Sequence, residues 1–167
     1  EDIPTLTLQC YNPDHHVCFT TNGNEPSGES QRYVGPLSLN EQMYSKSNIS
    51  AIRNCPEDQF KAPENVEHCI VIRAAVFDSL GNCVSATITN SYFVAALGCH
   101  LHGLPAVSLC VDSLDLFDFD RGIFVEGAHY DSVKPHWSGN YYQHGKEWER
   151  LSNIEFYEPD NTGINQL

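Results

Sequence analysis

Short apolar segments separated by turn residues dominate the first part of the chain. They are rich in β-branched residues or alternate apolar and polar positions, as strands do, over residues 5–10, 16–21, 33–39, 69–78 and 84–94. The last two segments form the clearest hairpin, because the Gly- and Asn-containing turn 79–82 lies between them. Several short strands at this spacing predict a small β-sandwich. Residues 40–66 are polar and show no sustained period, so we expect a long excursion there, with one helical turn near 39–44.

A different texture begins after the connector 95–103. Residues 104–111 resemble a buried strand, and 112–118 a short helix with Asp112 at its N-cap. Further strands are predicted at 123–126 and 148–158, on either side of an aromatic, glycine-containing loop. We therefore expect a mainly β fold, with a β-sandwich over 1–97 and a small, incomplete α/β segment over 98–167.

Length and charge restrict the function. The chain has 167 residues and a net charge of −13, with no block of Lys or Arg. Nucleic acid and anionic membranes are poor candidate partners, because both are bound through clustered basic residues. No apolar run is long enough to span a bilayer.

Cysteine spacing gives no metal or redox motif. The seven cysteines leave at least one thiol unpaired in a monomer, and their disulfide pairing cannot be deduced. Cys99, His100, His102 and Cys110 lack the two spaced ligand pairs of a structural zinc site. Asp112, Asp115, Asp118 and Asp120 do not fit a calcium loop, so we expect no metal and no cofactor.

Motifs for catalysis are also missing from the sequence. It contains neither a phosphate-binding glycine loop nor G-x-S-x-G. Glu147, Glu149 and Glu155 would share one face of a strand and could supply a glycosidase acid and base, although glutamates on a solvated face are the favoured interpretation. No catalytic residue is assigned.

Aromatic residues are the candidate binding group. They are Tyr130, Trp137, Tyr141, Tyr142 and Trp148, accompanied by His136. Such rings stack on sugars or peptides, but they also pin an irregular loop onto its sheet, and the second role is favoured for a small domain.

Two family resemblances cover most of the chain. The series Phe19–Pro26, Tyr33–Leu37, Val71–Phe77 and Ser85–Tyr92 resembles the C-terminal-type domain of chitobiase and β-hexosaminidase, which is an immunoglobulin-like sandwich. Asn22 replaces the usual Asp before glycine, and residues 40–66 form an insertion.

The remaining motifs are similar to the opening of the spore-coat CotH family of atypical, kinase-like proteins. They are Leu104–Leu109, Leu116–Phe117, Arg121–Gly127, Gly139–Gln143, Lys146–Arg150 and Asn153–Glu158. In that family the catalytic acidic residues lie farther along than Leu167, so none can be assigned here, and we expect a fragment of a longer polypeptide.

Together these resemblances imply a non-catalytic spacer or docking module of an extracytoplasmic CotH-like protein, secreted, periplasmic or at the cell surface. Its partners would be the rest of the parent polypeptide and a glycan or protein. The alternative is a carbohydrate-binding accessory module of a glycan-degrading enzyme. An unpaired strand edge after Glu158 would also allow a homodimer.

Overall fold

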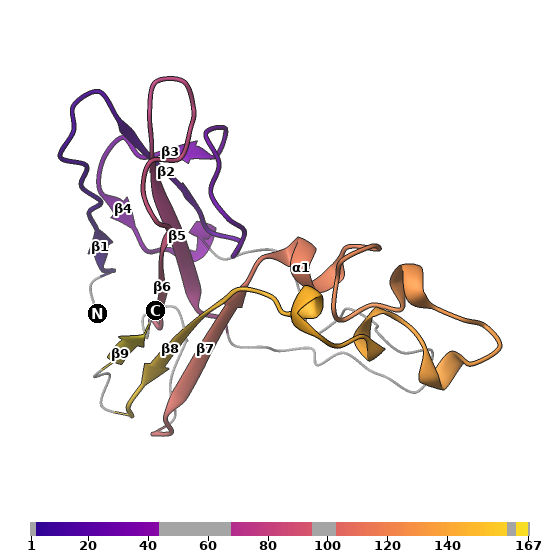
Figure 1. Ribbon diagram of the computed structural model, residues 1–167. Coiled ribbons are helices and arrows are strands. Elements are labelled where there is room, and N and C mark those ends of the chain that lie inside the picture. The colour runs from indigo at the N-terminus through magenta and orange to yellow at the C-terminus, as the bar shows by residue number, and fades with distance from the viewer. Residues whose placement is uncertain (1–2, 44–67, 95–102, 160–162, 167) are drawn as a thin grey trace. The chain divides into compact units, whose positions relative to one another are not determined.

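The computed structural model describes residues 3–43, 68–94, 103–159 and 163–166 (Figure 1). It confirms a mainly β fold built from antiparallel strand pairs. The chain divides into two compact units: unit 1 comprises residues 1–47, 65–110 and 153–167, and unit 2 comprises 48–64 and 111–152. The domain boundary predicted at residue 97 separates the two stretches that resemble different families, and it stays a prediction.

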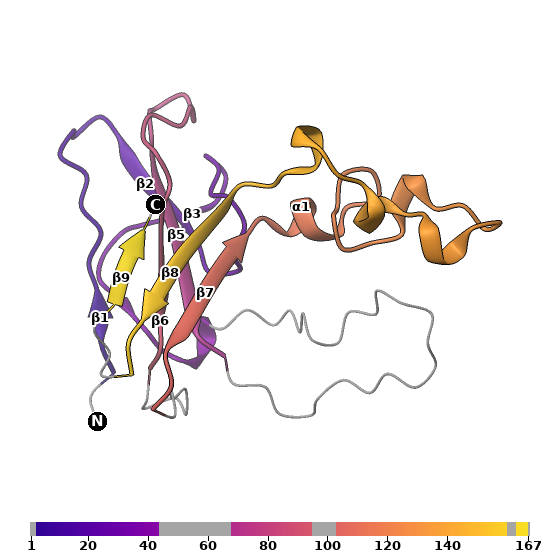
Figure 2. The same ribbon diagram turned by 60° about the horizontal axis from the view of Figure 1, so that its bottom comes forward.

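The described residues of unit 1 form three sheets. Sheet A pairs β1 (Thr5–Leu6) with β4 (Leu37–Ser38). Sheet B has the order β3-β2-β5-β6, formed by β3 (Gln31–Arg32), β2 (His16–Thr20), β5 (Ile70–Phe77) and β6 (Ile88–Tyr92). Sheet C has the order β7-β8-β9, formed by β7 (Ala106–Val111), β8 (Ser152–Tyr157) and β9 (Gly163–Gln166), and Figure 2 shows these strands side by side.

Sheet B has one strongly apolar face. Because successive side chains of a strand point to opposite faces, Val17 and Phe19 of β2 share a face with Ile70 and Ile72 of β5. Leucines of sheet A and the buried Leu39 pack against this face. Burying this surface between sheets A and B forms the core that the β-branched segments predicted.

The predicted hairpin 69–78/84–94 is confirmed, since β5 pairs antiparallel with β6 from Ile70↔Tyr92 to Ala74↔Ile88. A helical turn lies at η1 (Glu41–Met43), as expected. The insertion predicted at 40–66 falls mostly outside the described residues.

In the described part of unit 2, the first element is the predicted helix. In α1 (Ser113–Phe117), the side chain of Asp112 accepts from the Leu114 N–H at 2.9 Å and so caps the first turn. Four short 3-10 turns follow: η4 (Gly127–His129), η5 (Pro135–Trp137), η6 (Asn140–Tyr142) and η7 (Lys146–Trp148).

One strand prediction was wrong here, and a second needs a later start. Residues 123–126 form no strand, because their backbone folds back on α1: the Ile123 and Phe124 N–H groups donate to Asp115 and Leu116. Gly122 permits this close approach, since a Cβ there would collide with the backbone of Asp118. The strand predicted over 148–158 is confirmed as β8, but it starts at Ser152, because η7 curls residues 146–148 into a turn.

None of the helices that the structure describes has the length and apolar character needed to cross a membrane.

Candidate functional site

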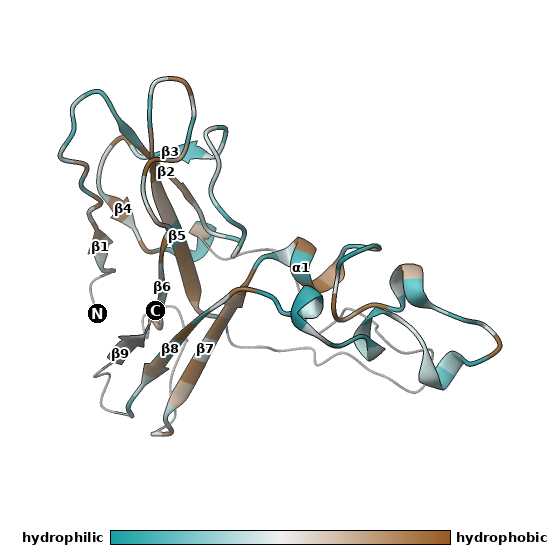
Figure 3. Cartoon of the chain, viewed as in Figure 1, coloured by the Kyte–Doolittle hydropathy of each residue, from teal (hydrophilic) through white to brown (hydrophobic). Residues whose placement is uncertain are grey.

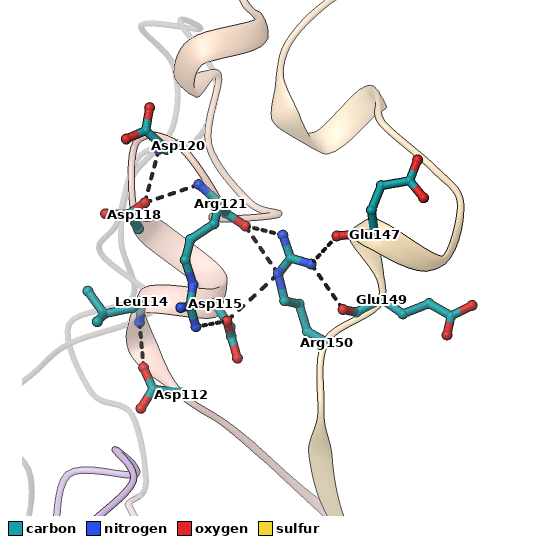
Figure 4. Close-up of polar contacts among 9 residues, drawn as sticks. All are labelled: Asp112, Leu114, Asp115, Asp118, Asp120, Arg121, Glu147, Glu149 and Arg150. Atoms are coloured by element: carbon teal, nitrogen blue, oxygen red, sulfur yellow. Dashed lines mark hydrogen bonds and ion pairs between the residues drawn. The ribbon is translucent and has the colours of Figure 1, made fainter.

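An arginine pair links the first and last parts of the segment 111–152 of unit 2. Arg121 forms an ion pair with Asp115 of α1, and Arg150 lies 3.8 Å from the same carboxylate (Figure 4). The Arg150 guanidinium also donates to the carbonyls of Arg121, Glu147 and Glu149. A planar group with five donors suits this task, and it ties α1 to the segment that precedes β8.

In the aromatic loop, the Asn140 side chain likewise links separate segments through hydrogen bonds. It is 1% exposed, its Nδ2 donates to the Phe119 carbonyl at 2.9 Å, and its Oδ1 lies 2.9 Å from Nδ1 of His129. Gly127 adopts a φ of 55° beside this amide, where a Cβ would collide with it. Over residues 111–152, Asn140 is the one buried side chain longer than glycine, while the apolar Leu114, Phe119 and Phe124 are exposed.

The aromatic residues predicted to bind a ligand lie on this loop. Tyr130, Trp137, Tyr141 and Tyr142 are exposed, and Trp137 is the most exposed of them at 71%. Trp137 and Tyr142 meet edge to face with centroids 6.1 Å apart. This contact holds the two rings together while leaving much of the indole accessible.

Trp148 has a different role. Its ring packs edge to face against His129 at 5.1 Å, and the Arg150 guanidinium lies 5.2 Å above it. These contacts link the aromatic loop to the arginine pair. Trp148 therefore pins the aromatic loop, whereas Trp137 is exposed to solvent. From the sequence alone, both residues fall in one group.

A buried polar layer lies on the other face of sheet B. The Glu155 side chain of β8 is 1% exposed and accepts from the Ser91 N–H at 3.0 Å and the Ser91 hydroxyl at 2.6 Å. The Tyr157 hydroxyl lies 2.8 Å from Glu155 and 2.7 Å from the Ser91 carbonyl, and Ser108 of β7 lies 2.6 Å from the Ser91 hydroxyl. Side chains of sheet C therefore bind the main chain of β6 and join sheets B and C.

Arg73 anchors the Asn22–Pro26 turn on the same face. It is 6% exposed, is ion-paired with Glu25, and donates to Thr89 at 3.2 Å and to the Gly23 carbonyl at 2.9 Å. The Cys110 thiol contacts that same carbonyl at 3.5 Å. All of these donors are used within the chain, so we assign the group a structural role.

Burial and the Glu155 carboxylate change the ionisation of their neighbours. Loss of solvation, the hydrogen bond to Glu155 and its negative charge raise the pKa of Tyr157 well above its usual range. Loss of solvation also raises the thiol pKa of Cys69 and Cys110. These groups are therefore kept neutral and are poor nucleophiles.

A pocket of about 290 Å³ lies on the apolar face of sheet B, the face that does not carry Ser91 and Arg73. Its lining includes Leu6, Leu8, Ile72, Ala74, Ile88 and Tyr92, and none of the five predicted binding aromatics.

The carboxylate geometry considered for glycoside hydrolysis was wrong. Glu155 is on β8 and buried, whereas Glu147 belongs to η7 and Glu149 follows it, both exposed. The three therefore do not share a strand face. Among the described residues no group of three or more His, Cys, Asp or Glu side chains could hold a metal ion, and Cys99, His100 and His102 lie outside them.

Sequence reasoning missed the residues that organise both units: Asn140, Arg150, Ser91 and the inward role of Glu155. A signal existed for the first two, because both lie in the motifs Gly139–Gln143 and Lys146–Arg150 that carry the second resemblance.

Comparisons with protein-family models, with curated proteins and with solved structures found no match to this chain.

Proposed function

We propose that this chain is a non-catalytic docking module, with the exposed aromatics of unit 2 as its binding surface. The observation that carries the proposal is the contrast between Trp137 at 71% exposure and the buried ionisable groups Glu155 and Arg73. Those two groups are bound to the chain itself, whereas the aromatics face solvent. Exposed aromatic rings held by a rigid scaffold are typical of recognition surfaces.

The resemblances support placing the module in an extracytoplasmic CotH-like protein, with unit 1 as an immunoglobulin-like spacer. An assay of ATP hydrolysis and phosphotransfer tests the non-catalytic role, because turnover would require a competent site within this chain. We expect none.

The alternative ligand is a glycan, and the Trp137 and Tyr142 pair favours it, because pyranose rings stack on accessible indole and phenol faces. Titration with chitooligosaccharides tests this, read out by tryptophan fluorescence. The chain has two tryptophans, so Trp148→Phe leaves Trp137 as the reporter. In this background, a shift that Tyr142→Ala abolishes and Tyr11→Ala retains would establish the glycan; no shift at millimolar ligand would remove it.

A homodimer remains part of the proposal. β9 is an end strand of sheet C, and an end strand offers main-chain groups to a second copy. Light scattering after size exclusion tests it, and a strictly monomeric mass would contradict it.

A further inference from the structure

Strands β7 and β8 expose an apolar face whose direction is fixed by the polar layer. Glu155 and Tyr157 of β8 bind Ser91, so Ile154 and Phe156 must point to the opposite side of the sheet. Ser108 of β7 likewise contacts Ser91, which directs its neighbours Val107 and Leu109 outward. The outward set is therefore a consequence of the fold.

We call this set the β7–β8 outer face; its members are Val107, Leu109, Ile154 and Phe156, with exposures of 64%, 62%, 48% and 36%. The two strands are hydrogen-bonded neighbours, so their side chains lie on one continuous surface. Figure 3 shows the hydrophobic colouring along β7. An exposed apolar patch of this kind marks an interaction surface.

The net charge of unit 1 indicates which kind of partner would bind to this face. The sequence of unit 1 holds three Lys and Arg against eleven Asp and Glu, a balance of −8. In the described part of this unit, Arg73 is buried in its ion pair and Arg32 is the exposed basic side chain. Strands β7 and β8 contain no Lys, Arg or His, and their one carboxylate is the buried Glu155. The exposed Glu158 directly follows β8.

This distribution disfavours a second copy on the face and favours a cationic partner. A second copy would bring the same acidic unit against this face, whereas Lys or Arg flanking an apolar segment would be attracted by the net negative charge of unit 1. We infer that the β7–β8 outer face docks a basic polypeptide segment, its apolar side chains on the four residues and its cationic side chains toward the acidic surface of unit 1. This site is separate from the unit 2 aromatics and does not rest on the function proposed for them.

Two synthetic peptides of about 12 residues test the inference on the full chain. Both carry the same alternating Val and Ile residues; one has Lys at the remaining positions and the other Glu. Fluorescence anisotropy should show that the Lys peptide binds at least about tenfold more tightly than the Glu peptide at low salt. This preference should shrink at about 0.5 M salt, because salt screens the attraction between exposed charges.

Matched variants distinguish binding at the β7–β8 outer face from nonspecific binding to other exposed apolar residues. Leu109→Gln with Ile154→Gln should weaken Lys-peptide binding at least about tenfold, while Val34→Gln with Leu80→Gln, at positions 93% and 85% exposed in the same unit, should leave it unchanged. Near-ultraviolet circular dichroism confirms that each variant is folded. Equal binding of the Glu peptide, or equal loss in both variants, would overturn the inference. A dimer that only the Leu109 and Ile154 variant dissociates would show that a second copy occupies the face, and would also overturn it.

Discussion

Glu155 accepts hydrogen bonds from both the main-chain N–H and the hydroxyl of Ser91, a residue 64 positions earlier in the chain. With Tyr157 bound to the Ser91 carbonyl, side chains of β8 occupy main-chain groups of the end strand β6 that another strand would otherwise pair. This arrangement covers part of an exposed sheet edge and orients sheet C.

Replacing Glu155 should therefore destabilise unit 1. Glu155→Gln keeps the size but turns an NH2 group toward Ser91 or Tyr157, which are already donors, and should lower the free energy of unfolding by about 1–3 kcal/mol. Urea unfolding measures this. Glu158→Gln, at an exposed position just after β8, is the control and should change stability by less than about 0.5 kcal/mol. Equal stability of the two variants would show that the Glu155 contacts contribute nothing.

Arg73→Met should release the Asn22–Pro26 turn. The substitution removes the bonds to Thr89, Gly23 and Glu25, and we expect a loss of about 1–3 kcal/mol, limited because the Glu25 side chain is 45% exposed and can regain water. Arg32→Met on the exposed strand β3 is the matched control. If both variants unfold at the same urea concentration as the parent chain, Arg73 does not anchor the turn.

Asn140→Ala should loosen unit 2 and spare unit 1. The Phe119 carbonyl keeps the Ala128 N–H but loses the Asn140 amide, and the His129 donors lose their acceptor, at a cost of about 1–3 kcal/mol. Because His129 packs on Trp148, the near-ultraviolet circular dichroism signal of Trp148 should weaken. Asn153→Ala, at a half-buried position in β8, is the control. An unchanged Trp148 signal would contradict the organising role of Asn140.

Alkaline pH should destabilise the fold. The pKa of Tyr157, Cys69 and Cys110 is raised in the folded state, so above about pH 8.5–10 the unfolded chain releases protons that the folded chain retains. The free energy of unfolding then falls as the pH rises, and it is unaffected by these groups at lower pH.

Tyr157→Phe removes one of the groups and should flatten the decline above about pH 10, although it costs about 1 kcal/mol at neutral pH through the lost hydrogen bonds. Unfolding in urea at a series of pH values measures both effects. Parallel curves for the parent chain and the variant would contradict the role of Tyr157.

The sequence predicted elements whose cause is local. The hairpin of β5 and β6 follows from β-branched runs around a turn, and α1 follows from the cap at Asp112. It mispredicted 123–126, because the backbone bonds to Asp115 and Leu116 involve no side-chain pattern. Contacts between residues far apart in sequence, such as Ser91 with Glu155, leave no periodic signal, so alternation marked Glu155 as solvated when its face is buried.

The candidate site was predicted in composition but not in arrangement. Sequence alone grouped the five aromatics, and it could not separate Trp137, which is exposed, from Trp148, which is covered by His129 and Arg150. That distinction depends on Arg150, which donates to the main-chain carbonyls of Arg121 and Glu147. Main-chain acceptors of this kind correspond to no sequence motif.

Transfer of labelled phosphate from ATP, by the purified chain, tests the central claim most directly. A non-catalytic docking module predicts no transfer to itself or to an added protein substrate, and no ATP hydrolysis above the buffer rate, with Mg²⁺ or Mn²⁺ present. Turnover that copurifies with the folded chain and is lost on substituting one of its own residues would contradict the account.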